Sequence, residues 1–123
     1  MIYENNLILI ERHESEIPWV KIFSKQGEKE LSDCPESTKM ALISAMFECE
    51  KAMIEFYNPE KINIASFGNY LPKVHIHVQA RFKDDSFFPE SMWGVKQRES
   101  SLNLPDFDKF AEILARKMQN MFD

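Results

Sequence analysis

The segment from Pro35 to Tyr57 constrains the fold most, because it carries the strongest helical pattern in the chain. Ser32 or Asp33 can cap its start, Pro35 suits the first turn, and Asn58-Pro59 ends it. Two groups of residues recur at helical spacing on different sides: an apolar stripe of Leu42, Met46, Cys49, Met53 and Phe56, and a second side of Met40, Ile43, Phe47, Glu50 and Ile54. We interpret the methionines as core-filling residues.

Strand patterns lie on both sides of this helix, and a second helical pattern closes the chain. The expected strands are 7–12, 19–24, 62–67 and 73–82, with a turn at Gly68-Asn69 between the last two. The second helix is expected over Asp106–Phe122, with Asp106 as its cap. This order predicts an α+β fold with an antiparallel sheet of about five strands, a long helix and a C-terminal helix. At 123 residues, the chain is expected to be a single domain, 1–123.

The charge distribution favours a small anionic ligand over a polyanion. A net charge of -5 argues against general binding of nucleic acid or anionic membranes. From Ile62 to Lys83, however, the chain has no Asp or Glu, while it has Lys73, Arg81 and Lys83. An acidic protein that handles phosphate needs a local region of this kind.

The N-terminal segment and the two thiols favour a cytoplasmic protein. The apolar run from Leu7 to Ile10 is too short for a signal-peptide core or a membrane span. Cys34 and Cys49 lie near or within the long helix, where reduced, partly buried thiols are ordinary. A disulfide scaffold is therefore not indicated, which fits a reducing compartment.

The segment from Val74 to Arg81 carries the candidate chemistry. Side chains alternate across a strand, so one face is expected to be apolar and the other polar. The apolar face is Val74, Ile76, Val78 and Ala80, and the polar face is His75, His77, Gln79 and Arg81. Neighbours along one face lie roughly 6–7 Å apart. Two imidazoles, a carboxamide and a guanidinium thus lie at separations that suit a phosphate group.

Four interpretations of this polar row compete. It can be an ordinary amphipathic strand with two solvated histidines. It can be a zinc site, although Gln79 is a poor third ligand and Asp84 and Asp85 lie beyond the row. It can be part of a serine- or cysteine-type hydrolase with a histidine base, but the sequence contains no nucleophile elbow, so this interpretation is set aside. The remaining interpretation is nucleophilic catalysis by histidine itself.

Catalysis by histidine needs specific surroundings. A neutral imidazole can attack phosphorus if an acceptor holds its other nitrogen, which fixes the tautomer. Charge that develops on the phosphoryl oxygens needs nearby donors and cations. Gln79 supplies an amide donor, and Lys73 or Arg81 supplies a positive charge. The loop at Gly68-Asn69 supplies donors from its backbone and side chains.

The motif in this strand and its flanking segments resemble those of the histidine triad superfamily. His75-Ile76-His77-Val78-Gln79 resembles the family signature, His-φ-His-φ-His with φ apolar, but with Gln in third place. Further markers are similar to a compact bacterial branch of hydrolases; in chain order they are Pro18-Trp19-Val20, Asn63-Ile64-Ala65, Gly68-Asn69, Pro72, Ala80-Arg81-Phe82, Asp84–Pro89 and Met92-Trp93-Gly94. The resemblance covers roughly Ile17 to Gly94.

The resemblance implies a histidine triad-like fold and a hydrolase, with a transferase as the alternative, that acts on nucleoside phosphoramidates or dinucleoside polyphosphates. His77 would form a covalent nucleotidyl-histidine, with His75 and Gln79 as the other catalytic residues. The implied substrate-binding residues are Asn63, Gly68, Asn69, Arg81 and Trp93. Trp93 can cover the pocket or pack on the core, and so can Trp19. His13 is expected to be a solvated turn residue without a role.

The glutamine in third place leaves the reaction open. Gln79 can donate a hydrogen bond but cannot act as an acid near neutral pH. A glutamine there is similar to the uridylyltransferase branch, so transfer to a sugar phosphate and a nucleotide-binding module with weak or no turnover remain as alternatives. The resemblance also implies a homodimer and no required metal, with Mg²⁺ arriving on the nucleotide. Neither nucleic acid nor membrane is an expected partner.

Overall fold

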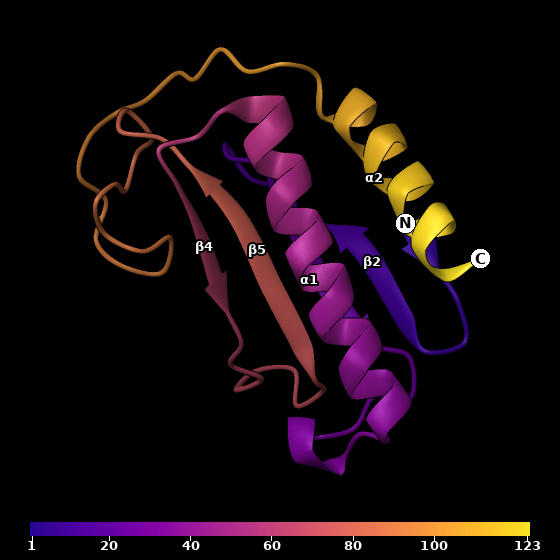
Figure 1. Cartoon of the computed structure of the whole chain (residues 1–123). Coiled ribbons are helices and arrows are strands. Elements are labelled where there is room, and N and C mark those ends of the chain that lie inside the picture. Colours follow the sequence, from indigo (N-terminus) through magenta and orange to yellow (C-terminus); the bar gives the residue numbers. More distant parts are fainter.

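The computed structural model describes all residues from 1 to 123 and shows one antiparallel sheet with two helices (Figure 1). The strands follow the order β1-β2-β3-β5-β4 across the sheet. A short 3₁₀ turn, η1, precedes the long helix. The elements are β1 Tyr3–Glu4, β2 Ile8–Arg12, β3 Trp19–Ser24, η1 Leu31–Asp33, α1 Glu36–Tyr57, β4 Lys61–Ala65, β5 His75–Arg81 and α2 Phe107–Phe122.

Both helices lie on the same side of the sheet. Helix α1 lies over the sheet and runs along β5, while α2 packs beside α1 near the two chain termini (Figure 1). One cluster of 21 buried residues fills the space between these layers. Its fully buried members come from every layer, among them Ile8, Ile10, Val20, Ile22, Leu42, Cys49, Met53, Val78, Phe110, Leu114 and Met118.

The predicted α+β class is confirmed, with five strands, one long helix and a C-terminal helix. The sequence did not reveal β1, whose two residues are too few for a periodic pattern. Asp106 caps α2 as expected, because its carboxylate accepts from the Asp108 N–H. Asn58 ends α1 in the left-handed conformation, at φ 49°.

The start of α1 differs from the prediction. Pro35 is the N-cap residue and offers no side-chain hydrogen bond. Asp33 instead belongs to η1, where its carboxylate accepts from the backbone N–H of Glu30. The 3₁₀ turn therefore uses the side chain that was expected to cap the long helix.

The two sides of α1 have different environments. Of the apolar stripe, Leu42, Cys49 and Met53 are buried and Met46 and Phe56 are half-buried. The second side is exposed, and its large apolar residues are Met40, Ile43, Phe47 and Ile54. The expectation that Met40 fills the core is therefore wrong. We call these four residues the α1 outer stripe.

Strand β5 is buried on both faces, so the interpretation as an ordinary amphipathic strand with two solvated histidines is wrong. All of its residues from His75 to Arg81 have little solvent exposure. The core covers one face, and the loop that carries Phe67 and the segment that carries Trp93 cover the other. Neither helix combines the length and apolar character that crossing a membrane requires.

Candidate functional site

The sheet register builds the site from two neighbouring strands. His75, His77 and Gln79 of β5 lie opposite Phe23, Lys21 and Trp19 of β3, pair by pair. Since side chains alternate on both strands, all six project toward the same face of the sheet. The polar row of β5 is therefore flanked by two aromatic residues and one cation from β3.

A cavity of about 440 Å³ opens beside the two histidines of β5. Its lining comes from β3, β5, the turn after β2, the loop between β4 and β5, and the segment after β5. The lining residues are His13, Lys21, Phe67, Gly68, Asn69, Tyr70, Leu71, His75, His77 and Trp93. None of them carries a carboxylate, and Lys21 contributes a positive charge. The lining thus favours an anionic ligand.

The environment of His77 keeps its imidazole neutral. Its side chain is only 8% exposed. The pKa of His77 is lowered to about 4, mainly by burial, with smaller contributions in the same direction from the charges that His75, His13 and Lys21 can carry. Near neutral pH, this imidazole therefore has one protonated nitrogen and one free lone pair.

Trp19 determines which nitrogen of His77 carries the proton. The indole Nε1 of Trp19 lies 3.0 Å from Nδ1 of His77, and both side chains are buried. An indole N–H can only donate, so Nδ1 must accept, and the proton of the neutral ring must be on Nε2. His77 is therefore held in its Nε2–H tautomer.

His75 is held in the opposite tautomer. Its Nδ1 lies 2.7 Å from the carbonyl oxygen of Lys73. A carbonyl only accepts, so Nδ1 of the neutral ring is protonated and Nε2 keeps its lone pair. The ring stacks on Phe23 at a centroid distance of 4.9 Å, and its centroid lies 4.9 Å from that of His77.

An aromatic cluster encloses His77. The Trp93 ring lies 5.0 Å from the His77 centroid, 5.2 Å from Trp19 and 4.8 Å from Phe67. The His13 ring stacks on the Trp19 ring at a centroid distance of 3.9 Å. The expectation that His13 is a solvated turn residue is therefore wrong, because its ring packs on Trp19 and lines the cavity. Trp93 lines the same cavity and packs on the surrounding rings.

Gln79 lies outside this cavity. It lines a second cavity of about 390 Å³ together with Asn63, and Phe67 and Trp93 line both cavities. Gln79 is 1% exposed, and neither atom of its amide has a hydrogen-bond partner in the protein. A buried amide without partners costs stability, which marks this position as unusual.

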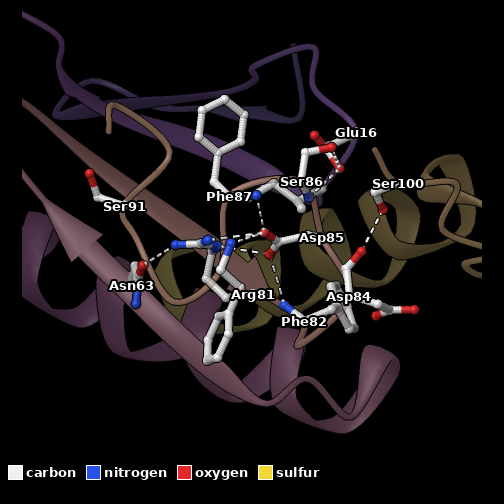
Figure 2. A network of polar contacts seen from close by, with 12 residues as sticks. Glu16, Asn63, Arg81, Phe82, Asp84, Asp85, Ser86, Phe87, Ser91 and Ser100 are labelled. Atoms are coloured by element: carbon white, nitrogen blue, oxygen red, sulfur yellow. Dashed lines mark hydrogen bonds and ion pairs between the residues drawn. The ribbon is translucent and has the colours of Figure 1, made fainter. Parts of the chain in front are cut away.

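Arg81 is committed to a buried ion pair (Figure 2). Its Nε and Nη2 each donate to one carboxylate oxygen of Asp85 at 3.0 Å, and Nη1 donates to Oδ1 of Asn63 at 2.8 Å. Asp85 also accepts from the backbone N–H groups of Phe82, Phe87 and Phe88. Burial alone would raise the pKa of Asp85, but these hydrogen bonds outweigh it and lower the pKa to about 2.

The structure brings together only part of the predicted site. His75, His77, Gly68, Asn69 and Trp93 line one cavity, whereas Asn63 and Gln79 line the other. Arg81 lines neither of them and is 1% exposed, so its guanidinium is not available to a phosphate in this structure.

Sequence reasoning missed Lys21, Phe67, Tyr70 and Leu71 as lining residues. The strand alternation of β3 could have identified Lys21, because it places Lys21 on the face of Trp19. No group of three or more His, Cys, Asp and Glu side chains is arranged to hold a metal ion.

Comparison with known proteins finds similar solved structures. A histidine triad protein from Bradyrhizobium japonicum is 26% identical with a TM-score of 0.78, over 95% of this chain and 88% of that chain. One from Sinorhizobium meliloti 1021 is 21% identical with a TM-score of 0.72, over 97% and 86%. One from Marinobacter aquaeolei VT8 is 22% identical with a TM-score of 0.68, over 98% and 85%. No protein-family model matches the sequence, and no curated protein matches it.

Three observations agree on the family. The sheet and its two helices match those of histidine triad proteins over nearly the whole chain. The His75-Ile76-His77 strand lies at the wall of the larger cavity, and that cavity has no acidic lining. The fold and the His75-Ile76-His77 strand therefore place the chain with the histidine triad proteins.

Proposed function

We propose that this protein binds a nucleoside phosphate in the 440 Å³ cavity and cleaves it through His77. The substrates are nucleoside phosphoramidates or dinucleoside polyphosphates, and the intermediate is a nucleotide bound covalently to His77. Gly68 and Asn69 contact the phosphate, and Lys21 neutralises its charge. Trp93 covers the bound substrate. Residues 1–123 act as one unit, in the cytoplasm.

The observation that carries this proposal is the neutral imidazole of His77 at the wall of a cavity without carboxylates. A protonated imidazole has no lone pair with which to attack phosphorus, so the lowered pKa preserves one ring lone pair near neutral pH. A carboxylate beside it would repel the anionic substrate, and the lining has none.

The proposed reaction has two steps. The lone pair of Nε2 forms a bond to phosphorus while the bond from phosphorus to the leaving nitrogen or oxygen breaks, and the leaving group keeps that electron pair. Water then attacks phosphorus and releases a proton to the solvent, the bond to Nε2 breaks, and the imidazole recovers its lone pair. Attack through Nε2 requires the proton of the neutral ring to be on Nδ1.

Gln79 is the reason for considering functions other than hydrolysis. It cannot protonate a leaving group, and it lies in the neighbouring cavity, so leaving groups that need an acid should react slowly. The same observation favours the alternative of a nucleotide-binding module with weak or no turnover. Transfer of the nucleotide to a sugar phosphate is a further alternative, with the acceptor in place of water. No metal is required, and Mg²⁺ enters only with the nucleotide.

The direct test is a quenched reaction with adenosine phosphoramidate and with a dinucleoside polyphosphate, analysed by intact mass. We expect a nucleotide adduct on the wild-type chain and none on His77→Asn. His13→Asn is the matched control, because it makes the same change in the same cavity and should still form the adduct. Tight nucleotide binding without an adduct or product would contradict the enzymatic proposal and support the binding module.

A sugar phosphate added to the same reaction separates hydrolysis from transfer. A nucleoside diphosphate sugar among the products would identify a transferase. The free nucleotide as the only product would identify a hydrolase. Chromatography of the products against standards distinguishes the two.

We also propose that the protein is a homodimer that buries the α1 outer stripe. Four large apolar side chains are exposed along one side of α1, and β4 leaves a free edge at the end of the sheet beside it. Phe47→Glu should convert a dimer to a monomer in sedimentation experiments, with Arg116→Glu, at an exposed position of α2, as the charge-reversal control. A wild-type monomer would contradict this proposal.

A further inference from the structure

We propose that Trp19 is a positioning residue that holds His77 in a tautomer unable to attack phosphorus, and so restrains the reaction proposed above. This inference rests on the proposed function, and it concerns the regulation of that same site. It follows from the hydrogen bond between the indole and Nδ1, and it assigns Trp19 a role beyond core packing.

The hydrogen bond has well-defined geometry. The two nitrogens are 3.0 Å apart, within the range of a good N–H to nitrogen contact, and the rings meet edge to face at 72°. Trp19 is 6% exposed and lies between His13 and Trp93, which pack on it. The indole therefore has little freedom to turn away from His77.

This hydrogen bond conflicts with attack through Nε2. In the attacking form, Nδ1 carries the proton, and that N–H would face the N–H of Trp19 across 3.0 Å. Two donors that face each other repel and leave both unsatisfied in a buried site. The Nδ1–H form therefore requires His77 or Trp19 to move.

His75 shows the arrangement that His77 lacks. The Nδ1–H of His75 donates to the carbonyl of Lys73, two residues before it on the strand. The equivalent carbonyl for His77 is that of His75, and the Ser66 hydroxyl already donates to it at 2.7 Å. Nδ1 of His77 has turned to the indole instead. The two histidines of one strand thus have opposite tautomers because their Nδ1 partners differ in kind.

The tautomer seen here suits binding rather than attack. With its proton on Nε2, His77 can donate a hydrogen bond to a phosphoryl oxygen of a ligand in the cavity. A substrate would then bind first, and the bond to phosphorus would form only after Nδ1 has left the indole. Trp19 thereby separates nucleotide binding from turnover.

The test compares Trp19→Phe with Trp93→Phe. Both variants replace an indole that contacts His77 by a smaller aromatic ring, but only Trp19 donates a hydrogen bond to it. The tautomer of His77 is read without substrate, from long-range ¹H–¹⁵N NMR of protein labelled on the histidine nitrogens. We expect protonated Nε2 in the wild type and in Trp93→Phe, and a shift toward protonated Nδ1 in Trp19→Phe.

The rate of adduct formation is the second readout, in a single turnover with adenosine phosphoramidate. Loss of one hydrogen bond should raise this rate in Trp19→Phe by roughly 2- to 10-fold. Should Trp19→Phe fail to fold, β-(3-benzothienyl)alanine at position 19 preserves the ring shape and removes only the N–H.

The outcomes separate this inference from the proposed function. Protonated Nδ1 in the wild type, an unchanged tautomer in the Trp19 variant, or slower adduct formation in that variant would overturn the inference. A shifted tautomer with no adduct in any protein would support the role of Trp19 in setting the tautomer and contradict the enzymatic proposal.

Discussion

The two ends of β5 are equally buried but chemically different. At the Arg81 end, the guanidinium and the Asp85 carboxylate use their hydrogen-bonding capacity on each other, on Asn63 and on backbone N–H groups. At the histidine end, His77 has one protein hydrogen bond, through Nδ1, and its ring lines a cavity. Gln79, between them, has none.

This difference separates structural from functional polar residues. A buried polar group whose partners are all in the protein stabilises the fold and has nothing left for a ligand. A buried polar group without partners costs stability, which suggests a ligand or a reaction that uses it. The same alternating strand therefore carries both kinds of residue, and only the partners distinguish them.

The largest expected change in stability is at the Arg81 end of β5, where the polar groups have their partners in the protein. Asp85→Ala removes one partner of a buried ion pair and leaves the Arg81 charge and three backbone N–H groups unpaired. We expect a loss of about 3–5 kcal/mol in the free energy of unfolding. Urea denaturation measures it, with the exposed neighbour Asp84→Ala as a control that should change stability by less than about 0.5 kcal/mol. A small loss in Asp85→Ala would show that the network is not structural.

At Gln79 of β5, we expect a substitution to increase the stability of the fold. Gln79→Met keeps the side-chain volume and removes an amide that has no partner, so the free energy of unfolding should rise by about 1–2 kcal/mol. Gln119→Met, on the exposed side of α2, is the control and should change stability by less than about 0.5 kcal/mol. A destabilised Gln79→Met would mean that the amide makes interactions that the fold depends on.

A smaller effect is expected from pH. The pKa of His77 is lowered from 6.5 to about 4, so between these values the unfolded chain binds a proton that the folded chain does not. The contribution of His77 to stability is therefore fully present above pH 6.5 and decreases as the pH falls toward 4.

An NMR titration of the imidazole protons checks this directly. The His77 midpoint should lie near pH 4, and that of His13 below 6.5, because burial lowers its pKa and the charge of Lys21 adds to this effect. In His77→Asn, the loss of stability between pH 6.5 and 5 should become smaller. A His77 midpoint near 6.5 would show that its ring is solvated and would weaken the contrast between the two ends of β5.

Much of the fold could be predicted from the sequence, because its signals are local. The proline before α1, Asn58-Pro59 after it and the alternation of β5 each determine structure within a few residues. The α+β class and the C-terminal helix followed from these patterns. The β1 strand did not, since it depends on pairing with β2 and not on its own pattern.

The site was predicted less completely, because partners distant in sequence determine what each polar residue does. Alternation placed His77 and Arg81 on one face, but not the Asp85 network that occupies the guanidinium. It also could not show that Trp19, which lies 58 positions away in the sequence, would donate to Nδ1 of His77. The roles of Trp93 and His13 likewise depended on the packing of loops.

The most direct test of the account is to locate the site at which a nucleotide binds. Adding AMP to labelled protein and following the side-chain resonances by NMR requires no turnover. The account predicts saturable shifts of the His75 and His77 ring protons and of the Asn69 amide, with the Arg81 guanidinium resonances unchanged. Shifts at Arg81 and Asn63 with the two histidines unaffected would place the ligand at the other end of β5 and contradict it.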